Sequence, residues 1–174
     1  MKLAIRLVQL ALLFALGIWL WTVFFPSPEK IIRQRLHRLA TDVSFSKNDG
    51  GLAKLTGLAE ASDVADFFAT NVAVNIDLPG NEQHTLAGRD EITQAALASR
   101  REVSTLSVKF PDINVTVAPD RQSATADVTI EVSTAGQTDN FDQELKISFT
   151  KTDRQWLISE VDTVSTLSHP SLKP

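Results

Sequence analysis

The first apolar segment of the chain is long enough to cross a membrane. Leu7 to Phe25 form a run of nineteen residues without a charge. A helix of that length covers roughly 28 Å at 1.5 Å per residue, close to the hydrocarbon thickness of a bilayer. Lys2 and Arg6 precede the run, and aromatic residues near its end suit the headgroup boundary. The pattern predicts a transmembrane anchor at residues 1–25 and a short linker at 26–28.

A cleaved signal peptide is the alternative interpretation of this segment. The apolar core of a signal peptide usually spans about 7 to 15 residues and ends in a small-x-small cleavage site. Here the run is longer and ends in Trp19, Trp21, Phe24 and Phe25, with no Ala-x-Ala exit. An uncleaved anchor is therefore the favoured interpretation, and the lipid bilayer is the first expected partner.

The charges on the two sides of the anchor give conflicting signals about orientation. Four basic residues follow it, namely Lys30, Arg33, Arg35 and Arg38, and their excess favours a cytoplasmic domain. A short basic leader directly before the apolar run is instead typical of a signal-anchor that exports the following domain. The four basic residues also lie on a predicted helix, where anionic headgroups can bind them. We expect a single-pass protein of the bacterial inner (cytoplasmic) membrane with its soluble domain on the extracytoplasmic side.

Helical periodicity dominates the chain up to about residue 102. Glu29 to Ser46 places apolar residues at three- and four-residue spacing, with Ser27 as N-cap and Pro28 at the first helical position. A second helix is predicted from Leu52 to Phe68, interrupted at Ser62-Asp63, and a third from Gly88 to Glu102. Between the last two, residues 72–77 alternate as a short strand and residues 81–84 form a polar loop.

From Val103 onward the period changes to two, which predicts four long antiparallel strands. The parity of the apolar positions changes across Pro111, the sequence mark of a bulge. Turns are predicted at 118–122, at Gly136 and at 151–154. The chain thus predicts an α+β domain over residues 29–167, with three helices on the concave face of a bent, cone-shaped antiparallel sheet, and a flexible tail at 168–174.

This order of elements resembles the nuclear transport factor 2-like superfamily, which includes ketosteroid isomerase, scytalone dehydratase and the polyketide cyclases. The resemblance rests on the passage Phe67 to Gly80, on Leu86 to Ile92, and on Trp156 at the start of the last strand. It implies a helix end, a short strand, a variable loop and a helix led by glycine, in that order. It implies little about activity, because members include isomerases, dehydratases, cyclases, transport adaptors and scaffold modules.

The charge distribution and composition exclude several classes of function. The net charge of −4 combines +5 over residues 1–48 with −9 over residues 49–174, so the acidic domain is not expected to bind nucleic acid. The chain has no cysteine, which excludes disulfides and thiolate ligands. Its three histidines are scattered, without the spacing of a metal site. No metal or cofactor is expected.

Two residues suggest catalysis. In the resemblance, Asp77 lies near the position of the isomerases' carboxylate base, one residue out of register with the following proline. His84 is its only potential partner for dehydratase-type chemistry, although a solvated loop histidine is the simpler interpretation. The isomerases' deep tyrosine donor cannot be present, because the chain has no tyrosine, and oxyanion donors usually contribute most to catalysis. Arg89, at the start of the third helix, is interpreted as part of an exposed first turn.

Asp142 and Glu144 lie on roughly the strand that supplies the second acidic donor in those isomerases, and they are the remaining potential ligand-binding residues. The favoured hypothesis is a membrane-anchored, non-catalytic domain that binds a small apolar ligand or a protein partner. A homodimer through the sheet is another option, which the polar outer face of the strands opposes. The alternative hypothesis is a pocket enzyme of the isomerase or dehydratase type with Asp77 as general base.

Overall fold

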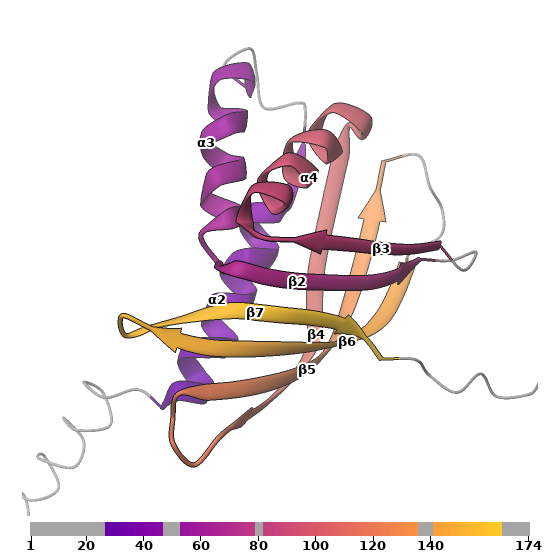
Figure 1. Ribbon diagram of the computed structural model, residues 1–174. Helices are drawn as coiled ribbons and strands as arrows, with labels where there is room; N and C mark the ends of the chain where they lie inside the picture. Colours follow the sequence, from indigo (N-terminus) through magenta and orange to yellow (C-terminus); the bar gives the residue numbers. More distant parts are fainter. Residues whose placement is uncertain (1–26, 47–52, 79–81, 136–140, 165–174) are drawn as a thin grey trace, which may run out of the picture.

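The computed structural model describes residues 27–46, 53–78, 82–135 and 141–164, as an α+β domain of three helices and one curved seven-stranded sheet (Figure 1). No helix in these ranges is both long and apolar enough to cross a membrane. The predicted anchor at 1–25 and the tail at 168–174 lie outside the described residues.

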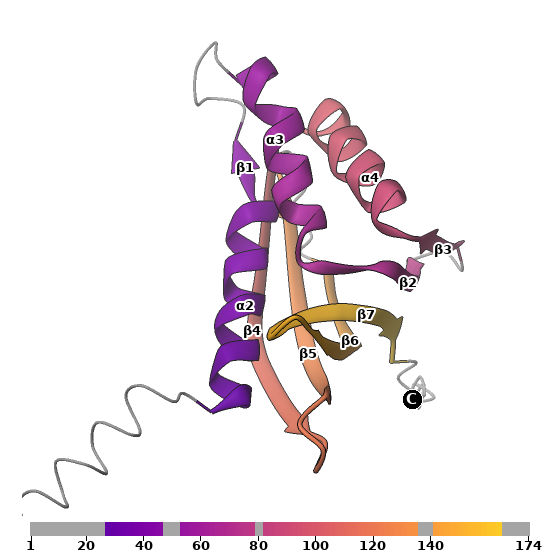
Figure 2. The same ribbon diagram turned by 60° about the vertical axis from the view of Figure 1, so that its left-hand side comes forward.

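The first helix, α2, spans Pro28–Val43 and begins as its sequence predicts. The Ser27 side chain accepts a hydrogen bond from the Lys30 backbone N–H at 3.4 Å, and Pro28 occupies the first turn. Ile32, Leu36, Leu39 and Ala40 form its buried face. In Figure 2, α2 runs along strand β4 at one side of the sheet.

The other two helices, α3 (Ala53–Ala65) and α4 (Arg89–Glu102), pack side by side (Figure 2). α3 continues through Ser62 and Asp63, so the predicted interruption is wrong. Gly88 precedes α4 with a φ of 83° while its N–H donates to the Val72 carbonyl at 2.8 Å. A residue with a Cβ rarely adopts this φ, which explains the glycine at this corner.

The sheet has the order β1-β4-β5-β6-β7-β2-β3. The strands are β1 (Phe45–Ser46), β2 (Phe68–Leu78), β3 (Glu82–Ala87), β4 (Thr105–Val117), β5 (Ser123–Thr134), β6 (Phe141–Thr152) and β7 (Gln155–Thr163). β2 and β7 pair in parallel, whereas the other neighbours are antiparallel. The sheet is therefore mixed, and the prediction of a fully antiparallel sheet is wrong.

The bend in the sheet lies where the sequence predicts it. The register of β4 against β5 shifts between Lys109 and Asp112, on either side of Pro111. Proline lacks the N–H that a continuous ladder needs, so the extra residue is accommodated as a bulge. Figure 1 shows the resulting curvature, with β2, β3 and β7 crossing the direction of β4 and β5.

The hydrophobic core lies between α2 and the inner face of this curved sheet. Its most completely buried large side chains are Ile32, Leu36, Val72, Phe149 and Ile158. Within the part of the chain that the structure describes, every side chain in the fully buried class is apolar. The described core is therefore built from apolar residues alone.

Candidate functional site

The end of β2 is fastened to the neighbouring strands by two polar side chains. The Asp77 N–H donates to Thr163 Oγ1 at 3.0 Å, and the Asp77 carbonyl accepts from Gln143 Nε2 at 2.8 Å. Gln143 Nε2 also donates to Thr163 Oγ1 at 3.1 Å. The main chain of Asp77 therefore belongs to a polar network that links β2, β6 and β7.

The carboxylate of Asp77 lies on the face of the sheet opposite to the side chains of Gln143 and Thr163. Val72, Val74 and Ile76 of β2 pack in or against the core, and side chains alternate along a strand. Asp77 is consequently directed to the outer face, where it is half-buried. Among the described residues its carboxylate has no hydrogen-bond or ion-pair partner.

His84 does not join Asp77 on one face. It lies in β3 directly opposite Ile76, while Asp77 lies opposite Gln83. Directly opposite residues in an antiparallel pair share a face, so Asp77 and His84 project from opposite faces. The predicted polar loop at 81–84 is wrong for 82–84, because the main chain of these residues pairs with β2. The structure thus does not form the pair required for dehydratase-type chemistry.

Asp142 and Glu144 also project from the outer face. They lie opposite Glu131 and Thr129 of β5, in alternation with the buried Leu145, and both are exposed. Neither is directed into the interior, where a donor for a bound ligand would lie. No group of three acidic or histidine side chains that could hold a metal ion occurs in the described ranges.

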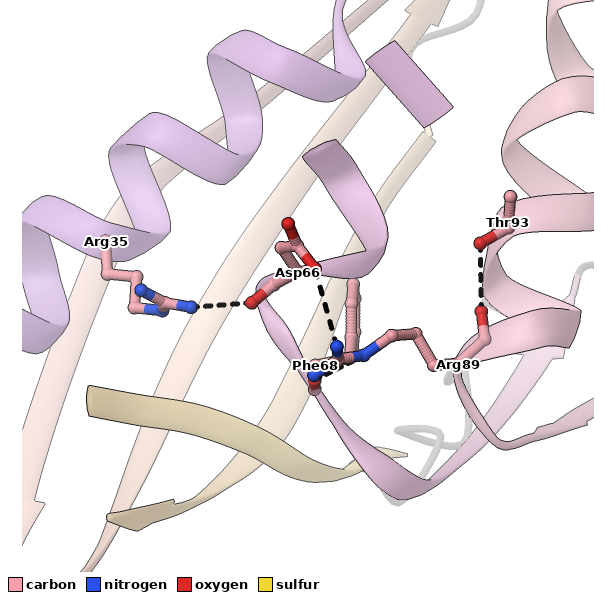
Figure 3. Close-up of polar contacts among 5 residues, drawn as sticks. All are labelled: Arg35, Asp66, Phe68, Arg89 and Thr93. Carbon is pink, nitrogen blue, oxygen red and sulfur yellow. Dashed lines mark hydrogen bonds and ion pairs between the residues drawn. The ribbon is translucent and has the colours of Figure 1, made fainter. Parts of the chain in front are cut away.

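A pair of arginines clamps the corner between α3 and β2 (Figure 3). Arg89 donates to the Phe68 carbonyl through Nη2 at 2.6 Å and through Nε at 3.2 Å, and its Nη1 lies 3.4 Å from Asp66 Oδ1. Arg35 Nη2, from α2, donates to the Asp66 carbonyl at 2.8 Å. The two guanidinium groups therefore fix α2 and α4 against the start of β2.

Arg35 is half-buried and packs against an aromatic ring. Its guanidinium lies 4.9 Å from the centre of the Phe67 ring, and its buried Nε has no hydrogen-bond partner in the described structure. Burial lowers the pKa of Arg35 below its ordinary value, and the nearby charge of Arg38 acts in the same direction. The group remains a cation at neutral pH, because a guanidinium group loses its proton only in strongly alkaline solution.

Sequence reasoning missed the roles of these polar residues. Arg89 is half-buried and clamps a carbonyl, so its interpretation as part of an exposed turn is wrong. Arg100 contacts α3 through Glu60 at 2.5 Å and lies 4.8 Å from the ring centre of Phe45 in β1. Each partner is distant in the sequence, and no local pattern identifies it.

An open groove lies between the second half of α2 and the first half of β4. Apolar side chains make up much of its lining, and Lys109 and His37 add charge or polarity. The groove is lined by His37, Ala40, Thr41, Ser44, Phe45, Leu106, Ser107, Val108, Lys109, Phe110 and Pro111. Its composition suits an apolar group with a polar or anionic edge.

Ser44, the C-cap of α2, and Arg33 of α2 already bind main-chain groups of β4 beside the groove. The Ser44 hydroxyl accepts from the Val108 N–H at 2.9 Å and lies 3.4 Å from the Val108 carbonyl. Arg33 Nη2 donates to the Ile113 carbonyl at 3.1 Å. An additional strand therefore cannot pair with β4 at these residues, and a ligand would contact side chains instead.

Comparison with known proteins identifies the fold. No family model and no curated protein sequence matches the chain. A solved NTF2-like protein of unknown function from Pseudomonas putida KT2440 aligns with a TM-score of 0.58 at 11% identity, over 84% of this chain and 96% of that one. The chain has the NTF2-like cone fold.

Two structures from Novosphingobium aromaticivorans share this architecture. A candidate scytalone dehydratase aligns with a TM-score of 0.55 at 12% identity, over 79% of this chain and 83% of that one. A candidate aromatic ring hydroxylase aligns with a TM-score of 0.53 at 14% identity, over 76% of this chain and 88% of that one. At these identities the likeness concerns the fold, and the activity has to be argued from the site.

Proposed function

We propose that this chain is a single-span protein of the bacterial inner membrane whose cone domain stands on the extracytoplasmic side. In this proposal the domain binds a small apolar ligand or a protein partner and catalyses no reaction. The observation that carries the proposal is the divergence of Asp77, His84, Asp142 and Glu144: all but His84 project from the outer face of the sheet, and His84 from the other.

General acid–base chemistry requires its groups to converge on one substrate, within hydrogen-bond reach of the reacting atoms. The acidic residues that the sequence predicts as candidates, Asp77, Asp142 and Glu144, do not project into the interior of the cone. The side chains near the end of β2 that do meet, Gln143 and Thr163, are neutral amide and hydroxyl groups engaged with the main chain of Asp77. Such groups can orient a bound molecule, but neither is a general base at neutral pH.

The groove between α2 and β4 is the surface that this proposal assigns to binding. A photo-crosslinking residue at Leu106, which lines the groove and lies on the inner face of β4, should capture the bound molecule in cells that produce the full chain. The same residue at Thr125, on the outer face of the sheet, is the matched control and should capture much less. Equal capture at both positions would contradict the groove as the binding surface.

The anchor is tested by fractionation of the full chain. The chain should remain in the membrane pellet after alkaline carbonate extraction, because nineteen uncharged residues suit the bilayer core. Leu13→Arg places a charge near the middle of the run, at a cost of about 2.5–3.5 kcal/mol on insertion scales. This variant should shift towards the soluble fraction, while Leu13→Ile should not. A native chain that carbonate extracts completely would contradict the anchor.

A second candidate function, a pocket enzyme with Asp77 as base, is favoured by one observation. The Asp77 carboxylate is half-buried and has no partner among the described residues, which leaves its oxygens available to a bound molecule. Asp77→Asn keeps the size of the side chain and removes its basicity. We expect cells with this variant to behave like cells with the native chain, whereas a phenotype equal to deletion of the chain would support the enzyme.

A further inference from the structure

The helix α2 has an exposed face that differs sharply from its buried one. The residues of α2 exposed to solvent are Lys30, Ile31, Arg33, Gln34, His37, Arg38 and Thr41. Three of these are permanently cationic and none is acidic. Because they recur at three- and four-residue spacing, they form one continuous stripe along the helix. The exposed stripe therefore has a net positive charge, with its cations between residues 30 and 38.

One member of this stripe is apolar and lies at the end of α2 nearest the predicted anchor. Ile31, in the first turn, is 37% exposed and one of two large hydrophobic side chains in the exposed class among the described residues. An isoleucine flanked by Lys30 and followed by Arg33 gives an apolar contact within a basic surface. A basic surface with an exposed apolar side chain can bind an anionic bilayer through both its charge and its apolar contact.

The outer face of the sheet carries the opposite charge. Two lysines, Lys109 and Lys146, lie on it among a larger number of carboxylates. The acidic residues of this outer face are Asp77, Asp112, Asp127, Glu131, Asp142, Glu144, Glu160 and Asp162. An anionic membrane would attract the α2 stripe and repel this face, so the charge distribution selects one orientation of the domain.

The sequence also limits how far α2 can lie from the bilayer. The predicted span ends at Phe25, and α2 begins at Pro28. Phe25 and Pro28 are three residue steps apart, so their Cα atoms lie at most about 11 Å from each other. The first turn of α2, with Lys30 and Ile31, must then lie close to the headgroup layer.

We propose that the exposed stripe of α2 docks the cone domain onto an anionic phospholipid surface. Lys30 and Arg38 bind lipid phosphates, Arg33 adds its charge beside the Ile113 carbonyl that it binds, and Ile31 inserts between the headgroups. The acidic sheet face is thereby turned away from the membrane. This inference rests on the proposed anchor and adds to it the surface that faces the bilayer.

The absence of native cysteines allows a direct test with single labels on the full chain in lipid nanodiscs. One label is placed at Gln34→Cys, in the middle of the stripe, and the matched control at Thr129→Cys on the outer sheet face. Lipids with a spin label near the headgroup quench a nearby fluorophore. In discs containing phosphatidylglycerol, we expect at least threefold stronger quenching at position 34 than at 129. The difference should shrink in purely phosphatidylcholine discs and in high salt.

Charge reversal on α2 tests whether the stripe binds the lipid or is only held close to it by the anchor. Lys30 and Arg38 are exposed, so Lys30→Glu/Arg38→Glu should fold normally, as an unchanged thermal unfolding curve would show. In this variant the excess quenching at position 34 should be lost, whereas the same reversals at the exposed Lys146 and Arg154 should leave it intact.

Two results would overturn the proposal in different ways. Equal quenching at positions 34 and 129 in anionic discs, or excess quenching that survives reversal at Lys30 and Arg38, contradicts docking while the anchor stands. A chain that separates from the discs during gel filtration contradicts the anchor itself, and docking with it.

Discussion

At the scale of single residues, two arginines bind backbone carbonyls at the corner before β2. Arg89 binds the Phe68 carbonyl through two nitrogen atoms and Asp66 through a third at 3.4 Å. The Asp66 side chain is 70% exposed, and exposed ion pairs contribute little to stability. The carbonyl contact, which is half-buried, should dominate.

The loss of the carbonyl contact should therefore destabilise the fold more than the loss of the ion pair. Arg89→Gln should lower the free energy of unfolding by about 1–3 kcal/mol, because the Phe68 carbonyl loses a charged donor. Asp66→Asn should lower it by less than about 1 kcal/mol, since it removes only the exposed ion pair. Urea denaturation measures both. A larger loss for Asp66→Asn than for Arg89→Gln would contradict this ranking.

The sequence predicted the position of residues such as Arg89 but not their contacts. Gly88 followed by Arg89 correctly indicated the start of a helix, because the signal is local. The carbonyl that Arg89 binds lies 21 residues earlier in the chain, and only the fold brings it near. For the same reason Asp77 could be placed at a strand end, but the face to which it points depends on the register with β3.

At the scale of elements, local chemistry explains what the sequence predicts correctly. The Ser27 cap, the Pro111 bulge and the tight turn after β6 each follow from a few adjacent residues. β3 was missed because its exposed, polar residues lack the alternation of a half-buried strand. The parallel pairing of β2 with β7 joins segments about ninety residues apart, and strand patterns do not specify such a partner.

The turn between β6 and β7 contains backbone strain that a substitution can relieve. Thr152 pairs with Gln155, and Asp153 and Arg154 between them have φ values of 50° and 67°. Two consecutive left-handed residues define a hairpin turn that strongly prefers glycine at its second position. Arg154→Gly should therefore raise the free energy of unfolding by about 0.5–1 kcal/mol.

The control for this prediction is the neighbouring strand residue. Gln155→Gly introduces the same flexibility where the backbone is extended, and it should lower stability by about 0.5–1 kcal/mol. Thermal unfolding of both variants reports the difference. Destabilisation by Arg154→Gly equal to that by Gln155→Gly would show that the turn is not strained.

At the scale of the whole molecule, positive and negative charges lie on different surfaces. The basic stripe lies on α2, and carboxylates dominate the outer face of the sheet. Two copies that packed these sheet faces together would bring like charges into contact, which is destabilising. We therefore expect the outer face to remain free of a second copy.

Cross-linking tests this expectation with a single introduced cysteine. In the cysteine-free chain, Thr129→Cys lies near the middle of the outer face. Mild oxidation of this variant in nanodiscs that hold two chains should yield less than about one tenth disulfide-linked dimer. The same variant denatured in urea should cross-link freely, which shows that the thiol is reactive. Efficient cross-linking of the folded chain would establish a dimer through the sheet.

The proposed function depends most directly on an anchored cone domain outside the cytoplasm. Asp127 is exposed on the outer face of the sheet, so Asp127→Cys supplies one accessible thiol on the domain. A maleimide that cannot cross the inner membrane should label this thiol in cells whose outer layers alone are permeable, and the labelled chain should sediment with the membranes. Labelling only after the inner membrane is broken would contradict the proposed placement of the domain.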